Sequence, residues 1–142
     1  MDISIACESL LDNREVPGHV ANRLQAAVWR EAIHLVSAGV ASVEDIDTAM
    51  WAGPGLRWAV MGPNMLFHLG AGEGGLDAFC ERYTDSFNRW WDDLGELHLN
   101  PTMAEKLVEG VKEESRGVPA AELCEKRDEM LAAILSVTNK LR

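Results

Sequence analysis

The sequence predicts an all-α domain in which about five or six helices form one bundle. Apolar residues recur at three- and four-residue steps along several segments, and no alternation of apolar and polar residues persists. Proline, glycine and helix-capping residues separate these segments. With 142 residues, 47% of them apolar and 25% charged, the chain is long enough to bury a core of its own. These observations together indicate a soluble, globular, helical protein.

Short local signals predict where the helices begin and end. A long first helix is expected between Pro17 and Gly39, and residues 1–16 are expected to form an irregular leader. Ser42, followed three residues later by the acidic Asp45, resembles a capping box and starts a short helix. The later helices are expected over residues 63–69, 76–94, 100–117 and 119–141.

Asn22 lies on the predicted apolar face of the first helix. Residues three or four positions apart share a helix face, which places Asn22 in line with Trp29 and Ile33. A buried side-chain amide without partners costs on the order of 1–3 kcal/mol, so this asparagine needs hydrogen-bonding groups. Two interpretations stay open: the amide caps a neighbouring turn, or it faces a substrate or a catalytic group.

A second candidate site lies in the segment Gly53–Trp58, which is rich in turn residues and ends with a cation and an indole. Binding residues are often found on loops that a rigid frame positions. We therefore consider Arg57 and Trp58 as candidate ligand-binding residues. The alternative is a surface arginine that stacks on Trp58 or pairs with one of the many acidic side chains.

The later helices have pronounced apolar stripes. Aromatic residues line one side of the helix at 76–94, which is typical of a core and equally of a subunit interface. Cys80 and Cys124 fall on apolar faces, where small core thiols are expected. The last helix has a seam of near-heptad spacing, formed by Leu123, Met130, Ile134, Val137 and Leu141. The helix before it is expected to bury Ala104, Leu107, Val108 and Val111.

Composition and missing motifs exclude several functions. The formal charge of −10 argues against binding to nucleic acids. The four histidines lack metal-ligand spacing, and the glycine-rich segment 70–75 lacks both a preceding strand and the spacing of a phosphate loop. No apolar run is long enough to span a membrane, and no signal peptide is evident. Three widely spaced cysteines suit reduced thiols, so we expect a cytoplasmic protein without a metal.

Four stretches of the chain resemble a known family. Glu15–Leu24, EVPGHVANRL, resembles the start of the helical C-terminal domain of the 3-hydroxyacyl-CoA dehydrogenase family. Gly55–Pro63, GLRWAVMGP, is similar to the branch that holds L-carnitine dehydrogenase and lambda-crystallin, an L-gulonate dehydrogenase, as are Gly70–Leu76 and Arg127-Asp128. The resemblance implies a 6-phosphogluconate-dehydrogenase-C-terminal-like helical bundle over residues 17–142.

The same resemblance implies roles for individual residues. In this family an N-terminal Rossmann domain binds NAD and supplies a catalytic His–Glu pair, and the helical domain closes over the substrate and forms a homodimer. Asn22 then matches the active-site asparagine, which positions the reacting oxygen and the catalytic histidine. Arg57, next to Trp58, is a candidate to bind a substrate carboxylate, and it could reach across the dimer to do so.

The chain departs from the family plan because no Rossmann fingerprint is evident in it. Hydride transfer needs a nicotinamide and a base placed against the substrate carbon, so this chain alone is expected to be inactive. We therefore expect the substrate-binding and dimerisation domain of an NAD-dependent dehydrogenase. Its substrate would be a small 3-hydroxy acid, carnitine- or gulonate-like, or a 3-hydroxyacyl-CoA. The alternative is a stand-alone, non-catalytic helical dimerisation or interaction module.

Overall fold

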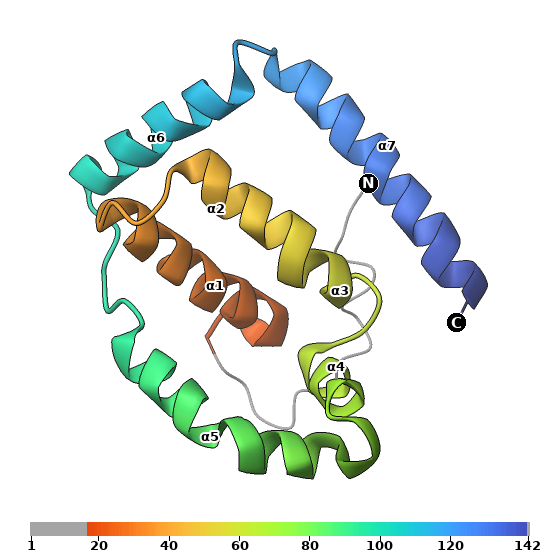
Figure 1. The fold of residues 1–142 in the computed structure, drawn as a ribbon. Helices are drawn as coiled ribbons and strands as arrows, with labels where there is room; N and C mark the ends of the chain where they lie inside the picture. The colour runs from red at the N-terminus through yellow and green to blue at the C-terminus, as the bar shows by residue number, and fades with distance from the viewer. Residues whose placement is uncertain (1–16, 142) are drawn as a thin grey trace.

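The computed structural model describes residues 17–141, and this part of the chain consists of helices without a strand (Figure 1). The α-helices are α1 (His19–Ser37), α2 (Val43–Met50), α3 (Leu56–Trp58), α4 (Pro63–Gly70), α5 (Gly75–Asp93), α6 (Pro101–Ser115) and α7 (Ala120–Leu141). A π-helical turn, Trp51–Gly55, joins α2 to α3, and a 3₁₀ turn, Gly72–Gly74, precedes α5. The predicted all-α fold is confirmed. The predicted leader at 1–16 lies outside the described residues.

Local capping interactions begin and end the helices where the sequence predicts. Ser42 Oγ accepts a hydrogen bond from the Asp45 N–H at 3.1 Å, and the Asp45 carboxylate accepts one from the Ser42 N–H at 3.2 Å. Hydrogen bonds from the Ser42 hydroxyl and backbone hold the pKa of Asp45 below its ordinary value. Asn100 Oδ1 accepts from the Met103 N–H at 3.0 Å and caps α6. After α1, Gly39 has the left-handed backbone typical of a helix stop, with φ of +73°.

α1, α2 and α6 pack against one another and form the framework of the domain (Figure 1). Ile33 and Val36, both on α1, are the buried hydrophobic side chains of the described residues, at 3% and 6% exposure. Lys106 Nζ of α6 donates to the Val36 carbonyl at 2.7 Å, which places a positive charge at the negative end of α1. A Cβ on Gly110 would overlap the Val43 side chain, so the glycine allows α6 to approach α2 closely.

A second connection to α1 positions the segment that follows α5. Glu31 Oε2 accepts a hydrogen bond from the Gly95 N–H at 2.8 Å in a half-buried position. Gly95 is itself buried, and a Cβ there would overlap the His34 side chain. The backbone therefore lies directly against α1 at this point, and glycine is the residue that fits.

Aromatic rings join α4 to α5. Phe67 of α4 stacks on Phe79 of α5 with ring centroids 4.6 Å apart. Phe79 lies 4.8 Å from Tyr83, and Phe87 lies 5.1 Å from Trp90, so the row of rings continues along α5. This row forms one side of the α4–α5 hairpin.

The glycine-rich turn between α4 and α5 has a structural use. His68 Nδ1 accepts a hydrogen bond from the Leu76 N–H at 3.1 Å, which satisfies one of the free N–H groups at the start of α5. Gly75 is buried, with φ of +59°, and a Cβ on it would lie 2.6 Å from the His68 ring. The predicted helix-to-helix turn is confirmed.

Much of the apolar surface of the domain is left uncovered. Val108 and Val111 of α6 are more than half exposed, at 53% and 52%, so the prediction that they are buried is wrong. Cys80 and Cys124 are exposed rather than in a core. α1 and α2 cover only part of the apolar side of α6, since Ala104 and Leu107 are half-buried while Val108 and Val111 are exposed. α7 lies apart from the other helices, and most of its apolar residues are exposed (Figure 1).

We expect Gly95→Ala to lower the free energy of unfolding by about 1–3 kcal/mol, because the new methyl group overlaps the His34 side chain. Urea unfolding followed by circular dichroism measures this difference. Gly70→Ala is the matched control, since a Cβ on Gly70 meets no atom within 4 Å. Equal unfolding midpoints for the two variants would show that the contact between residue 95 and α1 is not tight.

Like charges meet where α2 lies beside the C-terminal end of α6. Partial burial raises the pKa of Glu114, and the negative charges of Asp47 and Glu44 raise it further. Arg116 offsets part of this repulsion, because its Nη2 lies 2.6 Å from Glu44 Oε1.

Glu114→Gln should therefore raise the free energy of unfolding at pH 7 by a few tenths of a kcal/mol. A raised carboxyl pKa means that the folded state holds the proton more tightly than the unfolded chain does. The destabilisation by Glu114 consequently builds up as the pH rises above its ordinary pKa of 4.5, and the gain from Glu114→Gln fades below that value. Urea unfolding at pH 7 and below pH 4.5 tests this, with exposed Glu113→Gln as control. A gain that persists in acid, or an equal gain for the control, contradicts the explanation.

Candidate functional site

Asn22 lies near the N-terminal end of α1, and its side chain is exposed. The expectation of a buried amide is wrong, because other elements cover α1 only toward its C-terminal half, where Ile33 and Val36 lie. None of the hydrogen bonds within residues 17–141 involves this amide, so it caps no turn there. An exposed, unbonded amide keeps both its donor and its acceptor for a ligand.

Arg57 and Trp58 lie on α3, a single helical turn, rather than on the expected loop. The turn Trp51–Gly55 lies between α2 and α3, and the backbone leaves the helical path at Gly53, with φ of −102° and ψ of −108°, so a kink separates the two helices. A Cβ on Gly55 would lie 2.8 Å from the Met50 carbonyl oxygen, so this tight turn needs a glycine.

The Arg57 guanidinium is exposed, and it forms no ion pair with an acidic side chain of the described residues. The cation–π contact in this part of the chain joins Arg82 to Tyr83, at 5.9 Å, and not Arg57 to Trp58. Trp58 is 41% exposed. Within residues 17–141, therefore, Arg57 has neither the acidic partner nor the stacked indole that the alternative interpretation requires.

The candidate residues come from two elements that the fold directs to the same side. Figure 1 shows the N-terminal end of α1 pointing toward the side of the molecule that holds α3 and α4. No hydrogen bond joins Asn22 to Arg57 or Trp58 within the described chain. The two positions are thus separate polar groups on one domain, and neither is buried by packing.

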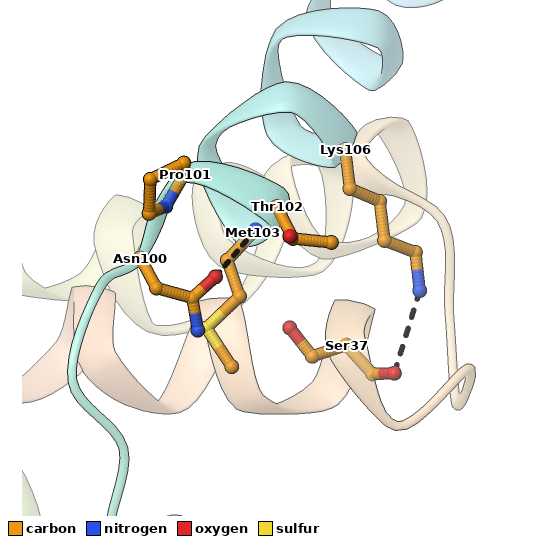
Figure 2. A pocket seen from close by; sticks show the side chains of 6 residues that line it. All are labelled: Ser37, Asn100, Pro101, Thr102, Met103 and Lys106. Atoms are coloured by element: carbon orange, nitrogen blue, oxygen red, sulfur yellow. Dashed lines mark hydrogen bonds between the residues drawn. The ribbon is translucent and has the colours of Figure 1, made fainter.

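An open hollow of about 550 Å³ lies elsewhere, between the C-terminal end of α1 and the start of α6 (Figure 2). Lys106 Nζ lies in it, 2.7 Å from the Val36 carbonyl oxygen and 3.4 Å from that of Ser37. Asn100 Oδ1 is bonded to the Met103 N–H. Lys106 thus joins α6 to α1 and Asn100 caps α6, so the hollow is a structural junction. Sequence reasoning missed Lys106 because its partners lie about seventy residues earlier in the chain.

The described residues offer no site for a metal or for NAD. No group of three or more His, Cys, Asp or Glu side chains among them is placed to hold a metal ion. They contain no strand followed by a glycine-rich turn, the arrangement that binds the phosphates of a dinucleotide. Between residues 17 and 141 no helix is long and apolar enough to cross a membrane.

Comparison with known proteins identifies relatives of this chain. The family model of the 3-hydroxyacyl-CoA dehydrogenase C-terminal domain matches residues 18–113. L-carnitine dehydrogenase of Bacillus cereus is 39% identical over 137 residues, which are 96% of this chain and 42% of that protein. L-carnitine dehydrogenase of Streptomyces coelicolor is 43% identical over 92% of this chain and 41% of its own length. L-carnitine dehydrogenase of Nocardiopsis dassonvillei is 44% identical over 85% of this chain and 37% of its own length.

The chain spans about two fifths of the length of these curated relatives. The family match extends from α1 almost to the end of α6, and thus includes both candidate positions, Asn22 and Arg57. The chain therefore belongs to the 3-hydroxyacyl-CoA dehydrogenase family, and its helices form the C-terminal domain of that family.

Proposed function

We propose that this chain is the substrate-binding and dimerisation domain of a cytoplasmic, NAD-dependent dehydrogenase. Its substrate is a small 3-hydroxy acid of the carnitine or gulonate type, or a 3-hydroxyacyl-CoA. The main support is the similarity to L-carnitine dehydrogenases, which extends over 85% to 96% of the chain. NAD is then bound by a Rossmann domain outside this chain, and this chain alone is inactive; the all-helical described residues, which lack the strand-and-glycine turn of a dinucleotide site, are consistent with this.

Arg57 and Trp58 suit the two charged groups of a carnitine-like substrate. L-carnitine, which the relatives' name identifies as their substrate, has a carboxylate and a quaternary ammonium group. A guanidinium binds a carboxylate through two parallel hydrogen bonds, and Arg57 is exposed without a competing acidic partner. The half-exposed indole of Trp58 offers a face to the quaternary ammonium.

Asn22 suits the reacting end of the substrate. Its amide has two N–H donors for the reacting oxygen and one carbonyl acceptor for the catalytic histidine of the Rossmann domain. Its support is indirect: the side chain is exposed and unbonded, on a 19-residue helix whose other end is fixed by burial of Ile33 and Val36.

The uncovered apolar faces support the proposal that other protein surfaces pack against this domain. Trp90 and Trp91, at the end of α5, are 53% and 62% exposed. Aromatic side chains in this state are enriched at interfaces, and a contiguous apolar surface is seldom left open to water. The same faces also suit a non-catalytic dimerisation module, so that alternative needs a direct test.

The intact mass of the gene product isolated from its native source separates the two functions. A product more than twice this length, as in the relatives, or a 15.6 kDa chain that copurifies with an NAD-binding chain, supports the dehydrogenase. A 15.6 kDa chain without an NAD-binding partner overturns it in favour of the module.

In the dehydrogenase isolated with its NAD-binding part, Asn22→Ala should lower kcat about a hundredfold, because the reacting oxygen loses a donor in the transition state. The substrate KM should change little. Gln25→Ala, at an exposed position one turn further along α1, is the control and should leave kcat unchanged. Normal turnover of the Asn22 variant would exclude the assigned role.

Arg57→Ala should instead raise KM for a hydroxy acid about tenfold to a hundredfold, since a charge-assisted hydrogen bond contributes about 1.5–3 kcal/mol. Arg57→Lys keeps the charge but loses the paired geometry, so its KM should lie between those of the alanine variant and the parent. Steady-state kinetics with the free acid and with its amide, which lacks the carboxylate charge, measure the effect. An equal loss with both substrates would remove the carboxylate from the explanation.

A further inference from the structure

The surroundings of α7 differ from those of the other helices. This 22-residue helix packs closely against none of α1–α6 (Figure 1). The family match ends at residue 113, before α7 begins, whereas the match to the Bacillus cereus relative covers 137 residues and extends into α7. The large apolar residues of α7 at near-heptad spacing, Leu123, Met130, Ile134, Val137 and Leu141, are between 41% and 83% exposed.

The exposed residues of α7 follow an unbroken heptad. From Ala120 onward, steps of three and four residues alternate through seven positions, and six of them are apolar. We call this set the α7 seam: Ala120, Leu123, Arg127, Met130, Ile134, Val137 and Leu141. Such a seam is the surface along which one helix packs against another at a small crossing angle.

Arg127 is the polar member of the α7 seam. Its guanidinium lies 2.8 Å from the Asp128 carboxylate of the same helix, and the side chain is 61% exposed. A single polar residue in a seam fixes the alignment of the paired helices and lowers the stability of the pair. A helix pair formed by this seam should therefore have one fixed alignment, and it should dissociate when the protein concentration is lowered.

Charges are distributed unevenly along α7. Its first half, Ala120–Met130, has four acidic and two basic residues, whereas Lys140 is the charged residue of the second half, Leu131–Leu141. Parallel pairing of two such helices would place two net acidic halves side by side. Antiparallel pairing places each acidic half beside the half with Lys140, and it also aligns the helix dipoles favourably.

We propose that the α7 seam pairs with the α7 seam of a second copy of this chain in an antiparallel arrangement. A second copy is the expected partner of the α7 seam because the seam is self-complementary. The apolar heptad extends along the whole helix, about 33 Å, and is a heptad when read from either end. The uneven charge also fits a copy of itself that runs the opposite way. The inference rests on the dimer of the proposed function and locates one contact of that dimer.

Analytical ultracentrifugation of the 142-residue chain over a range of concentrations tests the pairing. We expect a dimer whose dissociation midpoint rises at least tenfold in Ile134→Lys, because each dimer then contains two charges in its seam. Ala132→Lys, on the opposite face of the same helix, is the control and should leave the midpoint unchanged. Far-UV circular dichroism should show unchanged helix content in both, since both positions are exposed.

A cross-linking experiment tests the direction of the pairing. In a chain whose three native cysteines are replaced by serine, Met130→Cys lies near the middle of α7 and Leu123→Cys lies one heptad earlier. In an antiparallel pair with full overlap, the two copies of residue 123 are about 22 Å apart along the axis, whereas the two copies of residue 130 are side by side. A short bismaleimide should therefore link Met130→Cys dimers and leave Leu123→Cys unlinked.

Three results would overturn the proposal, and they differ in what they leave standing. A dimer unaffected by Ile134→Lys removes the α7 seam but keeps the dimer of the proposed function. Cross-linking through both cysteines shows a parallel pair and removes the antiparallel arrangement. A chain that is monomeric at all concentrations removes both the seam pairing and the proposed dimer, and it indicates that a different protein surface covers α7.

Discussion

The arrangement of the domain depends on two charged side chains that hold distant backbone segments against α1. Glu31 accepts a hydrogen bond from the Gly95 N–H, and Lys106 donates to the Val36 carbonyl. Each of these half-buried, charge-assisted bonds contributes about 1.5–3 kcal/mol, which is comparable to the burial of one of the two apolar side chains, Ile33 and Val36. The positions of α6 and of the end of α5 therefore follow from polar contacts to α1 and from the glycines that permit close approach.

Local features of the fold could be predicted from the sequence because their causes are local. The capping pair Ser42 and Asp45, and the cap at Asn100, are formed by residues three positions apart, so the chain itself displays them. The bond from Lys106 to Val36 joins residues seventy positions apart, and no pattern in the sequence pairs them. Burial was predicted poorly for a related reason. Periodicity identifies the apolar face of α6, but it does not tell whether another helix covers Val108 and Val111.

The candidate site could be predicted only through resemblance. Composition and spacing indicate a polar residue on α1 and a cation near a turn, and they leave both open to a structural explanation. Among the described residues Asn22 caps nothing and Arg57 has no acidic partner. Under the proposed function, what the two side chains bind also depends on surfaces outside these residues, and exposed aromatic side chains suit a domain that such surfaces cover.

The π-helical turn between α2 and α3 has a consequence for how the direction of Arg57 can change. The backbone of Gly53 lies outside the helical region, with φ of −102° and ψ of −108°, so the chain is kinked between α2 and α3. The direction of α3 relative to α2 is thus set by the backbone angles and length of Trp51–Gly55. A change in this turn would redirect Arg57 while its own chemistry stayed the same. Insertions and deletions in this turn, rather than substitutions of the arginine, are therefore the changes by which related sequences could redirect this side chain.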